Sequence, residues 1–221
     1  MRTYLFLFLA IFTVAALVGF GCAQLTTNSD QAPVISLPAP RTTGPVSVEQ
    51  ALAKRRSVRS YSDKQLTLEQ IGQLAWAAQG ITEPTRGLRT APSAMAVYPL
   101  TIYLVKSDGV FRYIPQGHQL QQITAADKRA EISGQASVRQ APLDMVIVGN
   151  MEKMRARSGP NAERFVYLEA GHVAQNIHLQ AVALGLASLS VGGFDPPAAT
   201  KALNLPADET VLYVIPVGYP K

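Results

Sequence analysis

The stretch KRRSVRSY, residues 54–61, gathers three arginines around one serine. Arg55, Arg56 and Arg59 repel one another, so the stretch either lies open to water or faces an anion. A guanidinium group binds a phosphate in a bidentate manner and stays charged at any relevant pH. The residue types therefore indicate a phosphate site around Ser57, and a solvated loop is the structural alternative.

Two further stretches offer polar groups to a ligand. APSAMAVYP, residues 91–99, lacks the GxSxG pattern of a nucleophilic serine, and no histidine and aspartate partners are recognisable. We therefore expect a turn in which Ser93 and backbone N–H groups face a polar ligand. VGGFDPPA, residues 191–198, places Gly192 and Gly193 at a strand end, where their backbone can approach a planar ligand and donate hydrogen bonds.

The histidine spacing does not favour a metal site. His172 and His178 are six residues apart on one predicted helix and point to different faces, and no HExxH motif or cysteine pair accompanies them. We predict no metal ligand here. Glu169, His172 and Gln175 are interpreted as polar groups that pack or make interface contacts along this helix.

Two capping boxes place the arginine stretch between helices. SVEQ, residues 47–50, and TLEQ, residues 67–70, each carry a hydroxyl at the N-cap and a glutamine three residues later. Helices therefore start at about residues 47 and 67, and the second stops near Gly80. A loop between two capped helices holds its residues in a defined place.

Short runs of β-branched and aromatic residues predict the strands. Asp108 and Gly109 form a hairpin signal between the first two runs. The longest helix spans residues 161–185, with Asn161 as N-cap and Gly185 as its stop. Helices and strands do not alternate regularly, which predicts an α+β fold with a mixed or antiparallel central sheet. The predicted strands are TIYLVK (101–106), GVFRYI (109–114), DMVIVGN (144–150), ASLSVGG (187–193) and VLYVIPV (211–217).

The longest helix is apolar on more than one face. Phe165, Leu168, Val173 and Ile177 leave little of its surface suitable for water. We therefore expect this helix to lie centrally and to be covered by a second subunit.

The N-terminal residues resemble an export signal. The run at residues 4–21 is uncharged, follows Arg2 and ends in small residues, which predicts a signal peptide over residues 1–23. Cys22, the single cysteine, lies where a bacterial lipoprotein carries its lipid, so lipidation and ordinary cleavage after Ala23 both stay open. We expect a periplasmic or cell-envelope protein, anchored to the membrane in the lipidated case.

Composition bounds the rest of the chain. Of its 221 residues, 48% are hydrophobic, which suits one domain with a full core. Residues 24–44 are rich in Thr, Ser, Pro and Ala and predict a linker, so the domain should start near Pro45. The net charge of +5 comes without an aromatic-interleaved basic patch, and we predict no nucleic-acid partner.

Taken together, these segments resemble the nitroreductase superfamily of FMN-dependent oxidoreductases, nearest to its azoline dehydrogenase and thiazoline oxidase branch. The resemblance implies an intertwined homodimer with FMN at the subunit interface. It covers nearly the whole domain, and its segments follow the family's order. They are RRSVRSY, APSAMAVYPL, GVFRYIPQGH, YLEAGHVAQNIHLQAVALGL, SVGGFD and IPVGYP.

The resemblance also implies roles for the arginine stretch. Arg55, Arg56 and Ser57 match the segment that holds the flavin phosphate, ribityl chain and pyrimidine edge. Arg59 falls where a cation faces the N1/O2 side of the ring. A fixed positive charge there would stabilise the anion formed on reduction and raise the reduction potential.

The other segments match the rest of the flavin site. Pro92–Ala94 correspond to a segment that the partner subunit usually contributes, and Gly192 and Gly193 to the stretch near flavin N5 and O4. Lys221 takes the place of a late basic residue that binds phosphate. Met95 stands where the azoline branch usually carries glycine, and Ala96 where many nitroreductases carry asparagine.

The resemblance therefore implies an exported FMN oxidoreductase that works by ping-pong hydride transfer through flavin N5 to a nitro compound, quinone or related acceptor. No dedicated catalytic acid or base is required, and NAD(P)H is the family's usual donor. A non-catalytic binding protein for flavin or another phosphorylated ligand stays open, as does azoline dehydrogenation.

Overall fold

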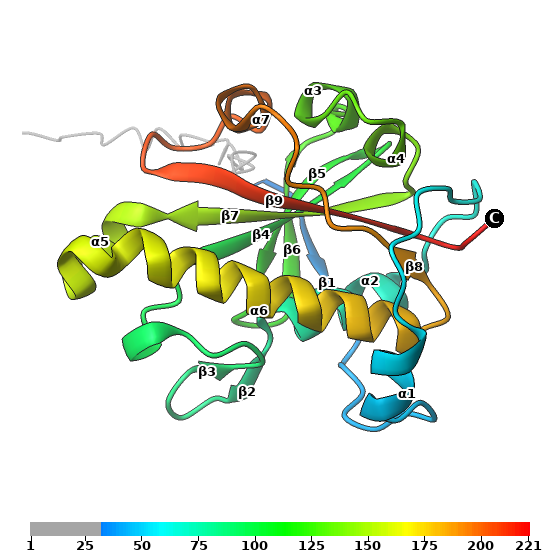
Figure 1. Cartoon of the computed structure of the whole chain (residues 1–221), viewed down its shortest axis with the longest axis horizontal. Helices are drawn as coiled ribbons and strands as arrows, with labels where there is room; N and C mark the ends of the chain where they lie inside the picture. The colour runs from blue at the N-terminus through cyan, green and yellow to red at the C-terminus, as the bar shows by residue number, and fades with distance from the viewer. Residues whose placement is uncertain (1–31) are drawn as a thin grey trace, which may run out of the picture. The chain divides into compact units, whose positions relative to one another are not determined.

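A seven-stranded sheet organises the domain, in the order β1-β6-β5-β4-β7-β9-β8 (Figure 1). The computed structural model describes residues 32–221. Every neighbouring pair of strands is antiparallel, which confirms the predicted α+β class with an antiparallel central sheet. The strands are β1 (Val34–Ser36), β4 (Leu100–Lys106), β5 (Gly109–Ile114), β6 (Gln119–Thr124), β7 (Leu143–Asn150), β8 (Ala187–Ser188) and β9 (Glu209–Gly218), and β2 (Ile81–Glu83) pairs with β3 (Leu88–Arg89) in a separate ribbon.

Helices cover both faces of the sheet (Figure 1). One face carries α1, α2 and α6, and the other carries α3, α4 and α7. The helices are α1 (Val48–Lys54), α2 (Leu68–Gln79), α3 (Arg129–Ile132), α4 (Ala136–Arg139), α5 (Met151–Ser158), α6 (Ala162–Ala183) and α7 (Pro196–Ala202).

The two capping boxes form as predicted. The Ser47 hydroxyl accepts from the Gln50 N–H at 3.2 Å, and the Gln50 side chain accepts from the Ser47 N–H at 3.2 Å. Thr67 and Gln70 exchange the same pair of bonds before α2. Local side chains therefore set where both helices begin, and they fix the ends of the arginine stretch.

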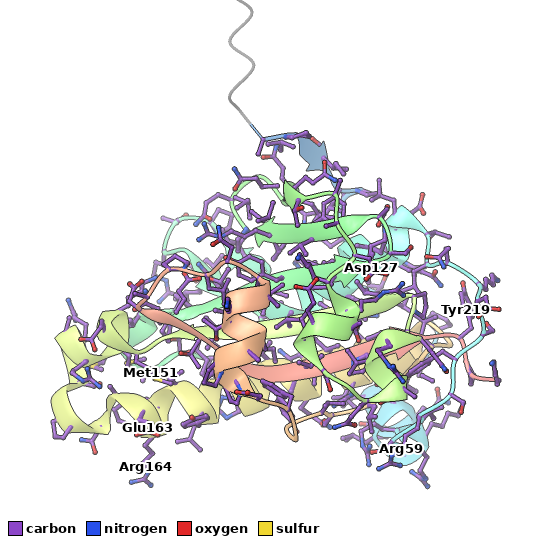
Figure 2. All side chains as sticks on the ribbon, turned by 90° about the horizontal axis from the view of Figure 1, so that it is seen from above. Arg59, Asp127, Met151, Glu163, Arg164 and Tyr219 are labelled. Carbon is purple, nitrogen blue, oxygen red and sulfur yellow. The ribbon has the colours of Figure 1, made fainter. Side chains whose placement is uncertain are left out.

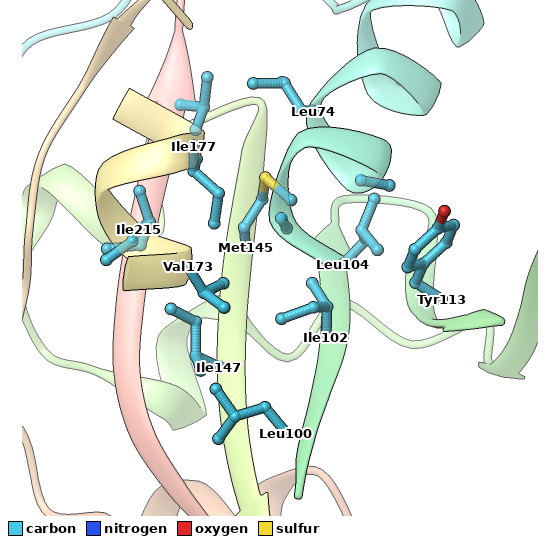
Figure 3. Packing of buried hydrophobic residues seen from close by; sticks show 14 of the residues in the cluster. Leu74, Leu100, Ile102, Leu104, Tyr113, Met145, Ile147, Val173, Ile177 and Ile215 are labelled. Atoms are coloured by element: carbon cyan, nitrogen blue, oxygen red, sulfur yellow. The ribbon is translucent and has the colours of Figure 1, made fainter. Parts of the chain in front are cut away.

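The core lies between the sheet and α6. Figure 3 shows Val173 and Ile177 of α6 packing against Met145, Ile147 and other buried strand residues. Along this helix Tyr167 and Leu168 are 52% and 51% exposed, so one apolar part of its surface stays uncovered in the single chain. The expected central helix is therefore confirmed, and the cover of its exposed apolar part by a second subunit stays a prediction.

The expected linker is shorter than the sequence suggested. Val34–Ser36 form β1 and pair with β6, and Leu37 is only 8% exposed. The Arg41 backbone N–H donates to the Gln73 side chain at 2.8 Å. Ordered structure thus begins before Pro45, because apolar residues inside the Pro-rich stretch complete the sheet edge. The signal peptide and Cys22 lie outside the described residues.

Several elements differ from expectation. The run at residues 187–193 forms only a two-residue strand, after which Val191 alone pairs with Val214. Helix α5 and strand β6 were not predicted, because α5 is highly charged and β6 is rich in glutamine. Within residues 32–221, no helix is long and apolar enough to cross a membrane.

Candidate functional site

The arginine stretch is held against β8 by backbone contacts. Ser57 pairs with Ser188 in a parallel bridge, and the Val58 N–H donates to the Ser188 carbonyl at 3.1 Å. Tyr61, 2% exposed, donates its hydroxyl to the Val58 carbonyl at 2.7 Å. The stretch is therefore a fixed segment of the fold, and the solvated-loop alternative describes only its outer side chains.

The three arginines differ in their surroundings. The Arg56 guanidinium donates to the carbonyls of Ala53 and Arg55, at 3.0 and 2.7 Å, and so caps the end of α1. Arg59 is exposed at the surface (Figure 2). Among residues 32–221, no carboxylate forms an ion pair with Arg55, Arg56 or Arg59. The stretch therefore carries positive charge that is available to an anion.

Gly192 and Gly193 follow the same strand edge and lie open to solvent. A methyl group added to Gly192 would meet no atom closer than 3.8 Å, and one added to Gly193 none closer than 3.7 Å. Within the described chain neither backbone N–H donates a hydrogen bond, while the Gly193 carbonyl accepts from Gln135 at 2.8 Å. The two N–H groups are therefore free to bind a polar, planar ligand that approaches closely.

A buried histidine links the arginine stretch to α6, in a role that the sequence did not predict. His178 contacts the Ser188 hydroxyl through Nδ1 at 2.8 Å and the Ser190 hydroxyl through Nε2 at 2.7 Å. Burial, followed by the nearby charge of Arg55, lowers the pKa of His178 to about 4. The ring is therefore neutral near pH 7 and fixes β8 beside Arg55.

The segment Pro92–Ala94 is held by a separate set of contacts. The Ser93 hydroxyl accepts from the Tyr98 N–H at 2.8 Å. Ser93 lies close enough to Glu169 of α6 to favour its ionised form, but burial has the larger effect and raises the pKa of the Glu169 carboxyl. Met95 and Ala96 both have φ of 53°, a left-handed conformation that favours glycine.

The two groups of predicted site residues lie on opposite flanks of α6. Ser93 lies near Glu169, whereas Ser188 bonds to His178 and the charge of Arg55 acts on it. Glu169 and His178 are nine residues apart, which is about two and a half helical turns, so they point in opposite directions. Within one chain the arginine stretch therefore pairs with Ser188 on one flank of α6, and Pro92–Ala94 lie on the other. Gly192 and Gly193 follow Ser188 four and five residues later in the chain.

Lys221 lies in a third place. It follows Pro220, which pairs with Tyr61, and lines a hollow of about 430 Å³ together with Arg129 and Arg139. Its predicted role as a phosphate ligand stays a prediction.

Comparison with known proteins identifies the fold and its class. The Nitroreductase family model matches residues 52–219. A candidate nitroreductase of Methanocaldococcus jannaschii is 37% identical over 183 residues, 78% of this chain and 91% of that protein. The crystal structure of a candidate nitroreductase from Ralstonia eutropha has a TM-score of 0.80 at 33% identity and covers 85% of this chain and 90% of its own.

A more distant structure shares the fold. The NADPH:FMN oxidoreductase of Vibrio harveyi, solved with NAD+, has a TM-score of 0.60 at 19% identity, over 79% of this chain and 69% of its own. This likeness concerns the fold alone. The chain belongs to the nitroreductase family and is an oxidoreductase.

Proposed function

We propose that the protein is an exported FMN-dependent oxidoreductase that passes electrons to a small organic acceptor, a nitro compound or a quinone. One observation carries the proposal: arginines without ion-pair partners in residues 32–221 lie against Ser188, and the same segment continues to the free backbone N–H groups of Gly192 and Gly193, which together suit a phosphorylated planar cofactor. Family membership supplies the class of reaction.

The residues present suit FMN. Arg55 and the Ser57 hydroxyl can bind its phosphate, and the N–H groups of Gly192 and Gly193 can bind the polar edge of its ring. Bound FMN supplies hydride transfer through its N5 atom. Arg59 contributes a positive charge that stabilises the negative charge gained on reduction. Arg56 supports the same segment by capping α1.

The division of the site favours a homodimer. Pro92–Ala94 lie on the flank of α6 opposite to the arginine stretch, so one ligand is served by both only if the second set comes from another copy. The exposed side chains of Tyr167 and Leu168 on α6, with Val48 and Leu52 on α1, supply apolar surface for that contact. We propose two equivalent sites, each completed by the partner's Pro92–Ala94.

Export, anchoring and the electron donor complete the proposal. The apolar run before Cys22 supports secretion to the periplasm or cell envelope, with a lipid on Cys22 as the membrane anchor. NAD(P)H is the usual electron donor of the family. Because NAD(P)H is scarce outside the cytoplasm, another reductant is the alternative donor for an exported enzyme.

Purified full-length protein tests the flavin assignment. We expect a yellow dimer whose flavin absorbance bleaches with dithionite and returns on addition of a quinone or a nitroaromatic compound. Arg59→Ala should weaken FMN binding or lower its midpoint potential, and Arg155→Ala on the exposed surface of α5 is the matched control. Colourless protein that does not take up added FMN would refute the enzyme and favour a binding protein for another phosphorylated ligand.

A further inference from the structure

A second cavity lies where two neighbouring strands separate. The β4–β5 ladder ends at the pair Tyr103 and Arg112, although β4 begins three residues earlier and β5 continues to Ile114. A cavity of about 290 Å³ is lined by both diverging strand ends, from Leu100 on β4 to Gln116 beyond β5. We call this cavity the β4–β5 cleft.

Three cations from three different elements line the β4–β5 cleft. They are Arg89 of β3, Arg112 of β5 and Lys153 of α5. Burial lowers the pKa of Lys153, and the charges of Arg89 and then Arg112 lower it further, with Glu169 acting in the opposite sense between them. The three positive groups are therefore close enough to repel one another, and the fold alone gives no reason for their convergence.

The carboxylates nearby act on these cations only from a distance and form no ion pair with them. Glu209 also lines the cleft, and its carboxylate accepts from the Tyr103 hydroxyl at 3.4 Å. Glu169 accepts from Gln79. Within residues 32–221, no carboxylate oxygen lies within 4.0 Å of the charged nitrogens of Arg89, Arg112 or Lys153.

Two donors in the cleft lack an acceptor. The Nε atoms of Arg89 and Arg112 are both buried, and neither has a hydrogen-bond partner in the described chain. Arg89 is otherwise fixed, because its Nη1 donates to Gln79 at 2.9 Å and its guanidinium lies 4.6 Å from the Tyr98 ring centre. A buried charged donor without an acceptor is costly, so its retention points to a missing partner.

Lys153 adds an ammonium group to the two arginines of the cleft. Its Nζ donates to the Tyr98 carbonyl at 2.9 Å, which uses one of the three donors of an ammonium group. The remaining donors can reach a ligand that enters from the open side of the cleft. A planar guanidinium pair with an ammonium is the donor set that suits an oxyanion.

We propose that the β4–β5 cleft binds a small oxyanion, the carboxylate or phosphate group of a ligand, through Arg89, Arg112 and Lys153. Its volume holds one such group with part of the molecule that carries it. The ligand oxygens accept from the guanidinium and ammonium N–H groups that line the cleft and offset the repulsion that Arg89 and Arg112 exert on Lys153.

The β4–β5 cleft is separate from the proposed flavin site of the same chain. Glu209, at the start of β9, lines the cleft, whereas Gly218, at the end of β9, pairs with β8 beside the arginine stretch. A ten-residue strand is about 30 Å long. Figure 2 shows Met151, at the cleft end, and Arg59 on opposite sides of the domain.

Calorimetric titration of the purified full chain with inorganic phosphate, and separately with succinate, tests the proposal. Chloride at matched ionic strength controls for general screening. We expect saturable binding that Arg112→Gln and Lys153→Met each weaken about tenfold, the loss of one charge-assisted hydrogen bond. Arg155→Gln, also on α5, is the control and should bind like the wild type. Circular dichroism and thermal unfolding confirm that each variant is folded.

Arg55 also binds phosphate in the proposed function, so Arg55→Gln separates the two sites. Binding that survives Arg55→Gln and is lost in Lys153→Met supports the cleft. Binding that is lost in Arg55→Gln and unchanged in both cleft variants overturns it, as does the absence of binding by either anion. Stronger binding of succinate indicates a carboxylate ligand, and stronger binding of phosphate indicates a phosphorylated one. Absence of FMN leaves these outcomes unaffected.

Discussion

Substitutions placed in different chains of one dimer test whether each proposed flavin site takes residues from both chains. Arg59→Glu reverses the charge on one flank, and Pro92→Trp places a bulky ring on the loop of the other flank, where Pro92 is exposed. In a dimer that carries one lesion in each chain, one site receives both lesions and the other receives neither. We therefore expect about half of the wild-type FMN content and quinone reduction, because one of two sites is intact.

Two affinity tags allow the mixed dimer to be purified and compared with matched pairs. Homodimers of either variant should be nearly inactive. A mixed dimer of wild type with the double variant should also be inactive, because each of its sites then carries one lesion. Flavin absorbance per dimer and the rate of quinone reduction measure both outcomes. The reverse pattern would refute the divided site: an inactive dimer of the two single variants and a half-active dimer of wild type with the double variant would show that each site belongs to a single chain.

Three further changes follow from individual positions. Met95→Gly should stabilise the protein by about 1 kcal/mol in urea unfolding, because Met95 has a φ of 53°, and Met95→Ala should not. Ile177→Ala should cost about 2 to 5 kcal/mol in the same assay, since Ile177 is fully buried under the sheet; a smaller loss would mean that the core refills the space. Burial raises the pKa of Asp144, whose carboxyl oxygens lack hydrogen-bond partners in residues 32–221. The folded protein therefore favours the protonated carboxyl. The stability gained in this way is complete below about pH 4 and is lost as pH rises through the raised pKa of the folded state. Asp144→Asn should therefore match the wild type near pH 4 and exceed it by about 1 to 3 kcal/mol at pH 8, and equal stabilities at pH 8 would contradict this assignment.

Local signals explain which elements were predictable. The boxes at Ser47 and Thr67 fixed two helix starts because the bonds join residues only three apart. The hairpin of β4 and β5 was predicted at Asp108 and Gly109, and the turn itself uses Ser107 and Asp108. Strand β1 escaped prediction because three residues carry little periodicity, and its pairing partner lies far away in the chain.

The sequence could name candidate site residues but not their arrangement. Family order assigned Arg55, Arg59 and Gly192, and their roles stay predictions; the structure adds that the arginine stretch pairs with Ser188. The contacts of His178 with two serine hydroxyls depend on packing between α6 and β8, which no local pattern encodes. The β4–β5 cleft likewise unites arginines from two strands that are distant in the sequence.

Strand β1 has a practical consequence for preparing the protein. The family match begins at residue 52, so a fragment cut to that boundary lacks β1 and exposes the backbone donors and acceptors of β6. An open strand edge recruits other chains and promotes aggregation. In the intact chain, Pro33 and Pro38 flank β1, and proline cannot extend a ladder of hydrogen bonds. Strand β1 and its flanking prolines thus complete the sheet and also end it. Soluble preparations should therefore retain the residues from Ala32 onward.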